Sequence, residues 1–273
     1  MLRKKGKSEL MDNFHSALRQ RRILLRTALA VLFLLLCRPP VVMGAAVKLT
    51  PEKERYYRAV YVLQSFGGPA AEEQVEIPAK VRRSDEAESL RFHPDRSLVL
   101  RELAGDLDEV ATDIPEARLF GAYARLSLGD RRRAADLLSR YVSDAPYAAR
   151  HYEILCRTLQ SLGDTTALYL ICREWQERDP SCRPERLLVT WKTLLAMGRF
   201  AEARAIVTND ATCLGLDGPL YAARAAEAAG DHKGAEDLVE AACRQTPAEE
   251  ARIRASWQRL RGMPAPVPTK VEE

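Results

Sequence analysis

Three stretches share one layout: GDRRRAADLLSRYVSDAP at residues 129–146, GDTTALYLICREWQERDP at 163–180 and GDHKGAEDLVEAACRQTP at 230–247. Each begins with Gly-Asp, ends with proline and follows an apolar segment of helical period. A glycine tolerates the left-handed backbone that ends one helix, the next residue can begin another, and proline stops that second helix. The three stretches therefore predict the turn and second helix of a repeated helical hairpin.

The repeat has a period of 32 to 35 residues. A fourth turn, Gly198-Arg199, falls between the others, and the successive glycines are 34, 35 and 32 residues apart. Within the second helix a small residue stands four positions before a larger apolar one, as Ala134 before Leu138 and Ala235 before Val239. A small side chain lets the second helix approach the first, and the larger one packs on the same face.

This pattern resembles the tetratricopeptide repeat (TPR) family, which has a period of 34 residues and an A-x3-F…P tail. The resemblance implies an all-α fold, an α-solenoid of stacked antiparallel helix pairs. Trp191 stands where the family has a small residue, and Leu168 replaces the small residue of its second helix, so these repeats are divergent. The four repeats span residues 115–147, 149–180, 184–213 and 216–247.

The flanks complete the predicted organisation. Residues 47–114 read as a divergent helical segment with helices over 51–66 and 95–112, joined by a polar stretch with either a short strand or, preferably, a loop. Residues 248–262 predict a capping helix, because Ile253, Trp257 and Leu260 recur at helical spacing and can cover the last apolar face. Proline-rich residues 263–273 form a loose tail.

The head of the chain, residues 1–46, differs from the rest. Of the 42 basic and 38 acidic residues, nine and two lie there, which leaves 33 against 36 in the remainder and argues against nucleic-acid binding. The uncharged run 27–37 is shorter than the roughly 20 residues of a spanning helix. It fits a signal peptide, with Gly44 and Ala46 as the small residues just before the cleavage site, or an uncleaved N-terminal membrane anchor. Either alternative predicts an exported, extracytoplasmic protein with membrane contact only through this segment.

Export makes the cysteines relevant, because exported thiols can oxidise. The repeat register places Cys156 and Cys172 on facing helices of one hairpin. They form either a disulfide or, as we favour, two small buried residues at a tight helix contact.

No catalytic, cofactor or metal motif is present in the sequence. It lacks a glycine-rich phosphate loop, a G-x-S-x-G elbow and an H-E-x-x-H helix, and its cysteines and histidines lack zinc spacing. His93-Pro94-Asp95 pairs imidazole with carboxylate, but Asp95 fits better as a helix N-cap. We expect a protein that is not an enzyme and has no cofactor.

The resemblance implies a groove lined by the first helix of each repeat. The residues at the middle of those helices are Tyr123, Arg157, Lys192 and Arg224. Three cations and a tyrosine form a ladder suited to an acidic protein segment or a C-terminal carboxylate.

The sequence thus predicts a non-catalytic interaction scaffold of the cell envelope that binds a peptide or protein segment. Two alternatives remain open. One is a structural subunit of a larger envelope or secretion assembly, which a long exposed apolar strip would favour. The other is an enzyme with its chemistry in residues 47–114, which requires a deep pocket with converging titratable groups.

Overall fold

The computed structural model describes residues 49–181 and 183–263. The chain divides into two compact units, Met1–Leu49 and Thr50–Glu273, and the description concerns the second. The predicted signal or anchor segment and all but the first residue of the predicted tail lie outside the described residues. Within them, no helix combines the length and the apolar character that crossing a bilayer requires.

Five helical elements and a loop precede the repeats. Helix α2 (Pro51–Ser65) begins with proline in its first turn, and the Thr50 hydroxyl accepts a hydrogen bond from the Lys53 amide. The stretch expected to be loop or strand instead holds η1 (Gly68–Glu72), α3 (Ala79–Arg82) and α4 (Asp85–Arg91). Helix α4 forms because Ser84 caps it and its buried residues Ala87 and Leu90 recur at helical spacing. Helix α5 (Arg96–Val110) begins at Asp95, whose carboxylate accepts from two backbone amides, as the capping interpretation predicted.

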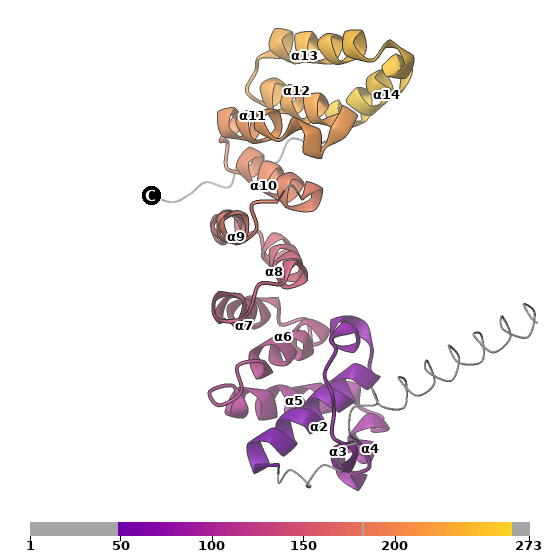
Figure 1. The fold of residues 1–273 in the computed structure, drawn as a ribbon, viewed down its shortest axis with the longest axis vertical. Coiled ribbons are helices and arrows are strands. Elements are labelled where there is room, and N and C mark those ends of the chain that lie inside the picture. The colour runs from indigo at the N-terminus through magenta and orange to yellow at the C-terminus, as the bar shows by residue number, and fades with distance from the viewer. Residues whose placement is uncertain (1–48, 182, 264–273) are drawn as a thin grey trace, which may run out of the picture. The chain divides into compact units, whose positions relative to one another are not determined.

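The nine helices that follow form four antiparallel pairs and a final helix (Figure 1). The pairs are α6 (Ala117–Ser127) with α7 (Arg131–Asp144), α8 (Ala149–Leu162) with α9 (Thr165–Arg178), α10 (Pro184–Ala196) with α11 (Phe200–Asn209), and α12 (Gly218–Ala228) with α13 (His232–Gln245). Helix α14 (Glu250–Arg261) ends the series. The prediction of an all-α, TPR-like helical repeat is confirmed.

The four predicted turns share one geometry. Gly129, Gly163, Gly198 and Gly230 all have positive φ, between 72° and 85°. In three of them the next residue is aspartate, and its carboxylate caps the second helix, as Asp164 does for the Ala167 amide at 2.9 Å. The turn at Gly198 has Arg199 instead, and α11 has no side-chain cap. Glycine and aspartate together therefore explain why one helix ends and the next begins within two residues.

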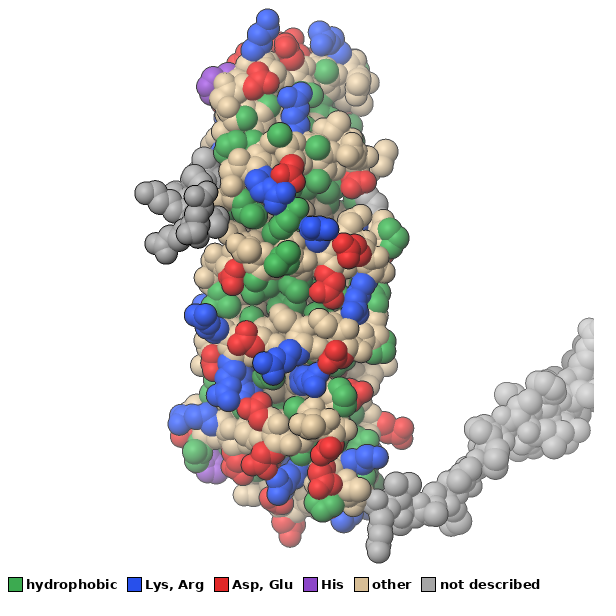
Figure 2. Space-filling model, turned by 90° about the vertical axis from the view of Figure 1, so that its left-hand side faces the viewer, with side chains coloured by type: hydrophobic (Ala, Val, Ile, Leu, Met, Phe, Trp, Pro, Cys, Tyr) green, Lys and Arg blue, Asp and Glu red, His purple; other side chains and the backbone are tan. Residues whose placement is uncertain are grey.

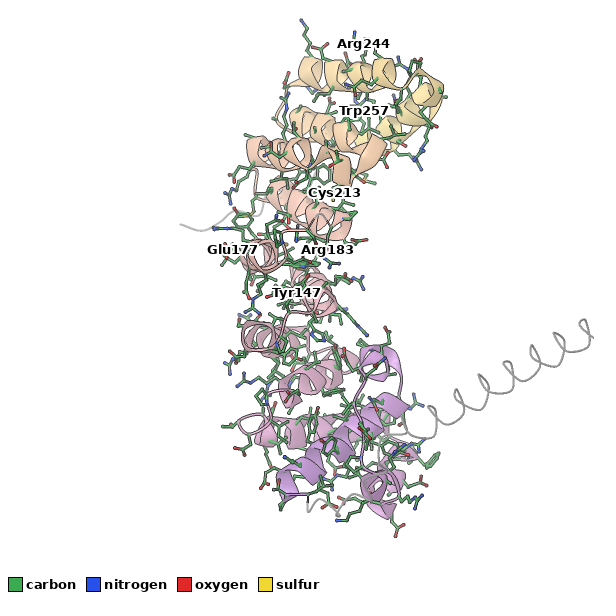
Figure 3. The ribbon with its side chains drawn as sticks, viewed as in Figure 1. Tyr147, Glu177, Arg183, Cys213, Arg244 and Trp257 are labelled. Carbon is green, nitrogen blue, oxygen red and sulfur yellow. The ribbon has the colours of Figure 1, made fainter. Side chains whose placement is uncertain are left out.

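Each pair packs on the next one along the chain, so the core is a series of local clusters. The small residues Ala134, Ala203 and Ala235 are fully buried where the two helices of a pair meet. At the end of the series, Ile253, Trp257 and Leu260 of α14 pack against the last pair (Figure 3). Helix α14 caps the apolar face that the fourth pair would otherwise expose.

Candidate partner-binding groove

The first helix of each pair carries one of the four predicted groove residues, but they do not form a ladder of free groups. Tyr123 is 1 % exposed, and its hydroxyl donates to Glu73 Oε1 at 2.7 Å. Arg224 is 7 % exposed and donates to the backbone carbonyl of Met263 at 3.0 Å. Arg157, whose side chain is 76 % exposed, and Lys192 do reach solvent.

The ladder prediction is corrected because segments outside the repeats cover two of its members. The connection between α2 and α3 lies over Tyr123, and the end of α14 supplies an acceptor to Arg224. The internal repeat pattern carries no information about either contact.

Two of the four residues, Lys192 and Arg224, instead line a single cavity of about 370 Å³. We call it the α8–α14 cavity, because its walls come from α8, α9, α10, α12 and α14. Most of its wall is apolar, with Leu159, Leu168, Trp191, Leu195 and Leu260 among the lining residues. A few polar groups in an apolar wall are typical of a ligand site, and this volume falls in the range of such sites.

Trp191, which lines the cavity, has a buried hydrogen-bond donor without a partner among the described residues. Its side chain is 4 % exposed and lines the cavity, and among the described residues its indole Nε1 has no acceptor. The ring meets Tyr221 of the next pair edge to face, with centroids 4.9 Å apart. A buried donor without an acceptor costs free energy, so a ligand oxygen that reached Nε1 would supply a hydrogen bond that the described residues do not make.

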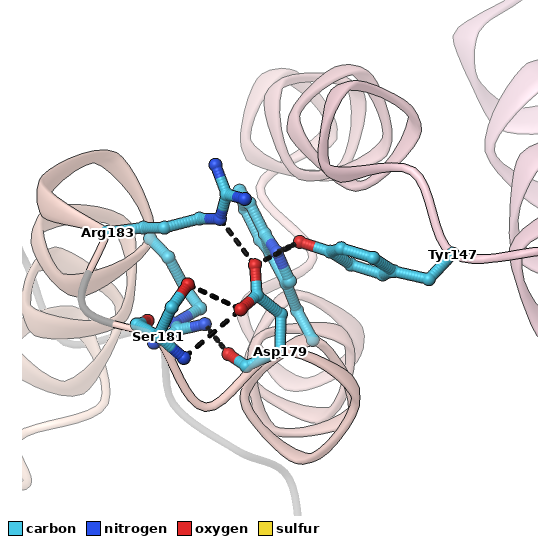
Figure 4. A network of polar contacts seen from close by, with 6 residues as sticks. Tyr147, Asp179, Ser181 and Arg183 are labelled. Carbon is cyan, nitrogen blue, oxygen red and sulfur yellow. Dashed lines mark hydrogen bonds and ion pairs between the residues drawn. The ribbon is translucent and has the colours of Figure 1, made fainter.

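A cluster of polar contacts at Asp179 fixes the second pair relative to the third (Figure 4). The Asp179 carboxylate accepts from Tyr147 before α8 and from Arg183 before α10, each at 2.5 Å, and also from Ser181. These hydrogen bonds hold the pKa of Asp179 well below its usual range, and the hydrogen bond from Ser181 makes the largest contribution. The Trp175 indole N–H extends the cluster by donating to the Tyr147 hydroxyl at 3.0 Å. The cluster thereby links the segment before α8 to the segment before α10.

Cys156 and Cys172 lie on facing helices of one hairpin, α8 and α9, where the register placed them. Both are buried free cysteines with their Sγ atoms 3.9 Å apart, so the structure does not contain the disulfide that was considered between them. A disulfide has its sulfur atoms about 2.05 Å apart, so the observed contact is between two thiols. The contact with Cys172, together with burial, raises the pKa of the Cys156 thiol. Cys213, by contrast, is disulfide-bonded.

A segment from outside the repeats covers part of the first helices of the first two pairs. Residues 67–76, which we call the strap, follow α2 and turn back alongside α6 (Figure 1). The Glu73 carboxylate of the strap lies 2.7 Å from the Tyr123 hydroxyl and 3.3 Å from His151 Nε2. Arg150 of α8 donates to the Pro69 carbonyl at 3.1 Å and pairs with Glu72 at 3.0 Å.

Sequence reasoning did not find the strap or its receptor residues. Glu73 stood in a stretch expected to be a polar loop, and His151 was one of several scattered histidines. The one available signal was the Gly67-Gly68-Pro69 turn followed three residues later by Glu72 and Glu73, because such a turn can send an acidic segment back toward the preceding helix. Among the described residues, no group of histidine, cysteine and acidic side chains could hold a metal ion.

The fold resembles solved structures of repeat proteins. One is YrrB, a TPR protein with an unusual peptide-binding site, at 13 % identity and a TM-score of 0.44, covering 57 % of this chain and 83 % of that one. Another is MamA, at 13 % identity and a TM-score of 0.43, covering 63 % and 98 % respectively. The sequence matches no family model and no curated protein. The class of this protein, a TPR-like helical repeat, thus rests on its own helix pairs and turns.

Proposed function

We propose that this chain is a non-catalytic scaffold that binds an extended segment of a partner protein in the α8–α14 cavity. The unpartnered Trp191 indole in an apolar, open cavity is the observation that supports this most. An aliphatic side chain of the segment fills the cavity, and a carbonyl or carboxylate oxygen accepts from Trp191 Nε1 once a small shift of the indole uncovers this buried atom. Exposed Lys192 on the same wall favours an acidic residue next to that side chain.

The exposed apolar residues support capture over a fixed place in a larger assembly. The large apolar side chains exposed among the described residues lie on separate elements, such as Phe92 after α4, Leu162 in α8 and Leu170 in α9. The face that includes the second helices mixes charges of both signs with small apolar areas (Figure 2). A subunit packed among permanent neighbours is expected to have a larger continuous apolar surface.

The test is selection from a random peptide display library on the immobilised full chain. We expect the selected peptides to share an aliphatic residue close to an acidic one. Trp191→Phe keeps an aromatic side chain, although a smaller one, and loses the donor, so it should weaken their binding about five- to tenfold, the effect of about one hydrogen bond. Lys192→Glu should weaken it further, whereas the matched reversal Arg157→Glu, outside the cavity wall, should change it little. Equal binding to wild type, Trp191→Phe and Lys192→Glu would contradict the proposal.

We further propose that the protein acts outside the cytoplasm, in the cell envelope. The support is the basic residues 1–26 followed by the apolar run 27–37 and the small residues Gly44 and Ala46. Intact mass of the native protein from the envelope fraction distinguishes cleavage from anchoring. Recovery of the full-length chain only from the cytoplasmic fraction would contradict export.

A further inference from the structure

The strap binds α6 and α8 as an acidic peptide ligand would. The Glu73 carboxylate receives the Tyr123 hydroxyl at 2.7 Å, His151 Nε2 lies 3.3 Å away, and Arg150 Nε lies 4.0 Å away. Tyr123 is 1 % exposed and His151 is 8 % exposed, so these groups are positioned within the protein and aim at one carboxylate. Carboxylate recognition by hydroxyl, imidazole and guanidinium groups on neighbouring helices is a binding site in chemical terms.

Side chains outside the strap also donate hydrogen bonds to its backbone carbonyls, as side chains of a binding site do to a bound peptide. The Pro69 carbonyl accepts from Arg150 at 3.1 Å, and the Glu73 carbonyl accepts from the Gln64 side chain at 2.9 Å. Gly67 and Gly68 have φ of 83° and 68°, a conformation that returns the chain toward α6 at little cost only for glycine.

The strap does not pack as a continuous part of the core. A cavity of about 170 Å³ lies between Gly67–Ala70, Arg96 and Leu100 of α5, and Tyr123 and Ser127 of α6. Most strap side chains after the turn, including Glu72, Gln74 and Glu76, are exposed. Apart from Ala70, which is 3 % exposed, the strap is therefore held mainly by polar contacts, which water or another ligand can replace.

We propose that the strap is a built-in ligand, and that Tyr123, Arg150 and His151 form a second binding site for an extended acidic segment of a partner protein. The partner gains access when the strap is displaced. Because the strap is tethered at both ends, its effective concentration at the site is of the order of millimolar. A partner segment can replace it only if its affinity and concentration are high enough to compete with the tethered strap. The site shares no lining residue with the α8–α14 cavity and stands whether or not the cavity binds a peptide.

The experiment supplies the strap as a separate molecule. Residues 67–76 are replaced in the full chain by a Gly-Ser linker of equal length, and a fluorescent synthetic peptide GGPAAEEQVE, the strap sequence, is added. We expect this variant to bind the peptide at least about tenfold more tightly than the wild type does, because the tethered strap occupies the wild-type site. Replacing the glutamate that corresponds to Glu73 by glutamine in the peptide should weaken binding about tenfold, a typical effect of one charge-assisted hydrogen bond. The same change at Glu76, which is exposed, should leave binding unchanged.

Absence of peptide binding by the folded linker variant, or equal binding of the two glutamine peptides, would overturn the proposal. If the linker variant does not fold, amide hydrogen exchange on two single variants of the full chain decides instead. Glu73→Gln should speed exchange of residues 67–76 by about tenfold, while Glu76→Gln should not. Equal exchange in the two variants would then overturn it.

Discussion

The first two helix pairs and the last two are built from the same repeat but differ in what lies on their first helices. On α6 and α8 the strap satisfies Tyr123 and His151 with the Glu73 carboxylate. On α10 and α12 the α8–α14 cavity is open, and Trp191 Nε1 has no acceptor within residues 49–181 and 183–263. Repeats of one family therefore supply a scaffold, and the segments between and after them decide which part of its surface is available.

Removing the C-terminal cap should have the largest effect on this comparison. Trp257 is buried against the last pair, and Trp257→Ala should lower the free energy of unfolding by about 3–5 kcal/mol in denaturant titration. Leu260 and Met263 lie next to it in sequence and line the cavity, so the open region should lose hydrogen-exchange protection before the strap region does. Arg252→Ala, an exposed change in the same helix, should stay within about 0.5 kcal/mol. Simultaneous loss of protection in both regions would show that the two halves are one cooperative unit.

Two tyrosines test whether the strap depends on its own receptor. Tyr123→Phe removes the donor to Glu73, and Tyr152→Phe removes an equivalent donor to Glu174 at 2.8 Å in the second pair. Each substitution should lower the free energy of unfolding by about 1–1.5 kcal/mol, measured by thermal or denaturant unfolding, because a carboxylate loses one neutral donor. Only Tyr123→Phe should speed amide exchange in residues 67–76. Equal exchange in the two variants would show that the strap is held by other contacts.

Acid should release the strap and leave the open half intact. Burial raises the pKa of Glu73, but the contacts with His151, Tyr123 and Arg150 outweigh it, so the pKa lies below its ordinary value of 4.5. The stabilisation from ionised Glu73 is therefore fully present above pH 4.5 and is lost as the pH falls through the lowered folded-state value. Tyr56 of α2 and Tyr141 of α7 both interact electrostatically with the Glu73 carboxylate, and the Tyr141 ring also contacts His151. Burial raises the pKa of both tyrosines, so both stay neutral between pH 3 and pH 6.

The measurement is exchange of residues 67–76 between pH 6 and pH 3, corrected for the intrinsic pH dependence of exchange. We expect protection to fall only at the acidic end, while the Glu73→Gln variant shows low protection throughout. A fall in protection centred above pH 4.5 would mean that a group other than Glu73 controls the strap.

The smallest expected effect concerns the turns. Asp164→Ala removes the N-cap of α9 beside the cavity and should lower the free energy of unfolding by about 1 kcal/mol. Arg199→Ala at the equivalent turn should cost less, about 0.5 kcal/mol, because α11 has no side-chain cap and Arg199 makes a surface ion pair with Glu202. Equal losses in denaturant titration would show that the aspartate is not what begins these helices.

Much of the architecture could be predicted because it depends on local physics. A glycine that tolerates positive φ, a capping aspartate and a recurring small residue act within one hairpin, so their spacing reveals the repeat. Helices α3 and α4 were missed because their apolar positions are few and the elements are short. The groove residues were chosen by register alone, which locates a side chain on a helix but not what covers it.

What the sequence determined by itself is the class of fold: four helix pairs, their turns and a capping helix, each specified by residues close together in the chain. Only the tertiary structure decided which side chains on the first helices are covered by other segments and which are free to contact a partner. Tyr123 meets Glu73 across 50 residues and Arg224 meets Met263 across 39, while the Cys156 and Cys172 thiols come into contact as free groups. Contacts at such separations depend on how whole segments pack, because no local propensity or period encodes which distant side chain reaches a given helix face.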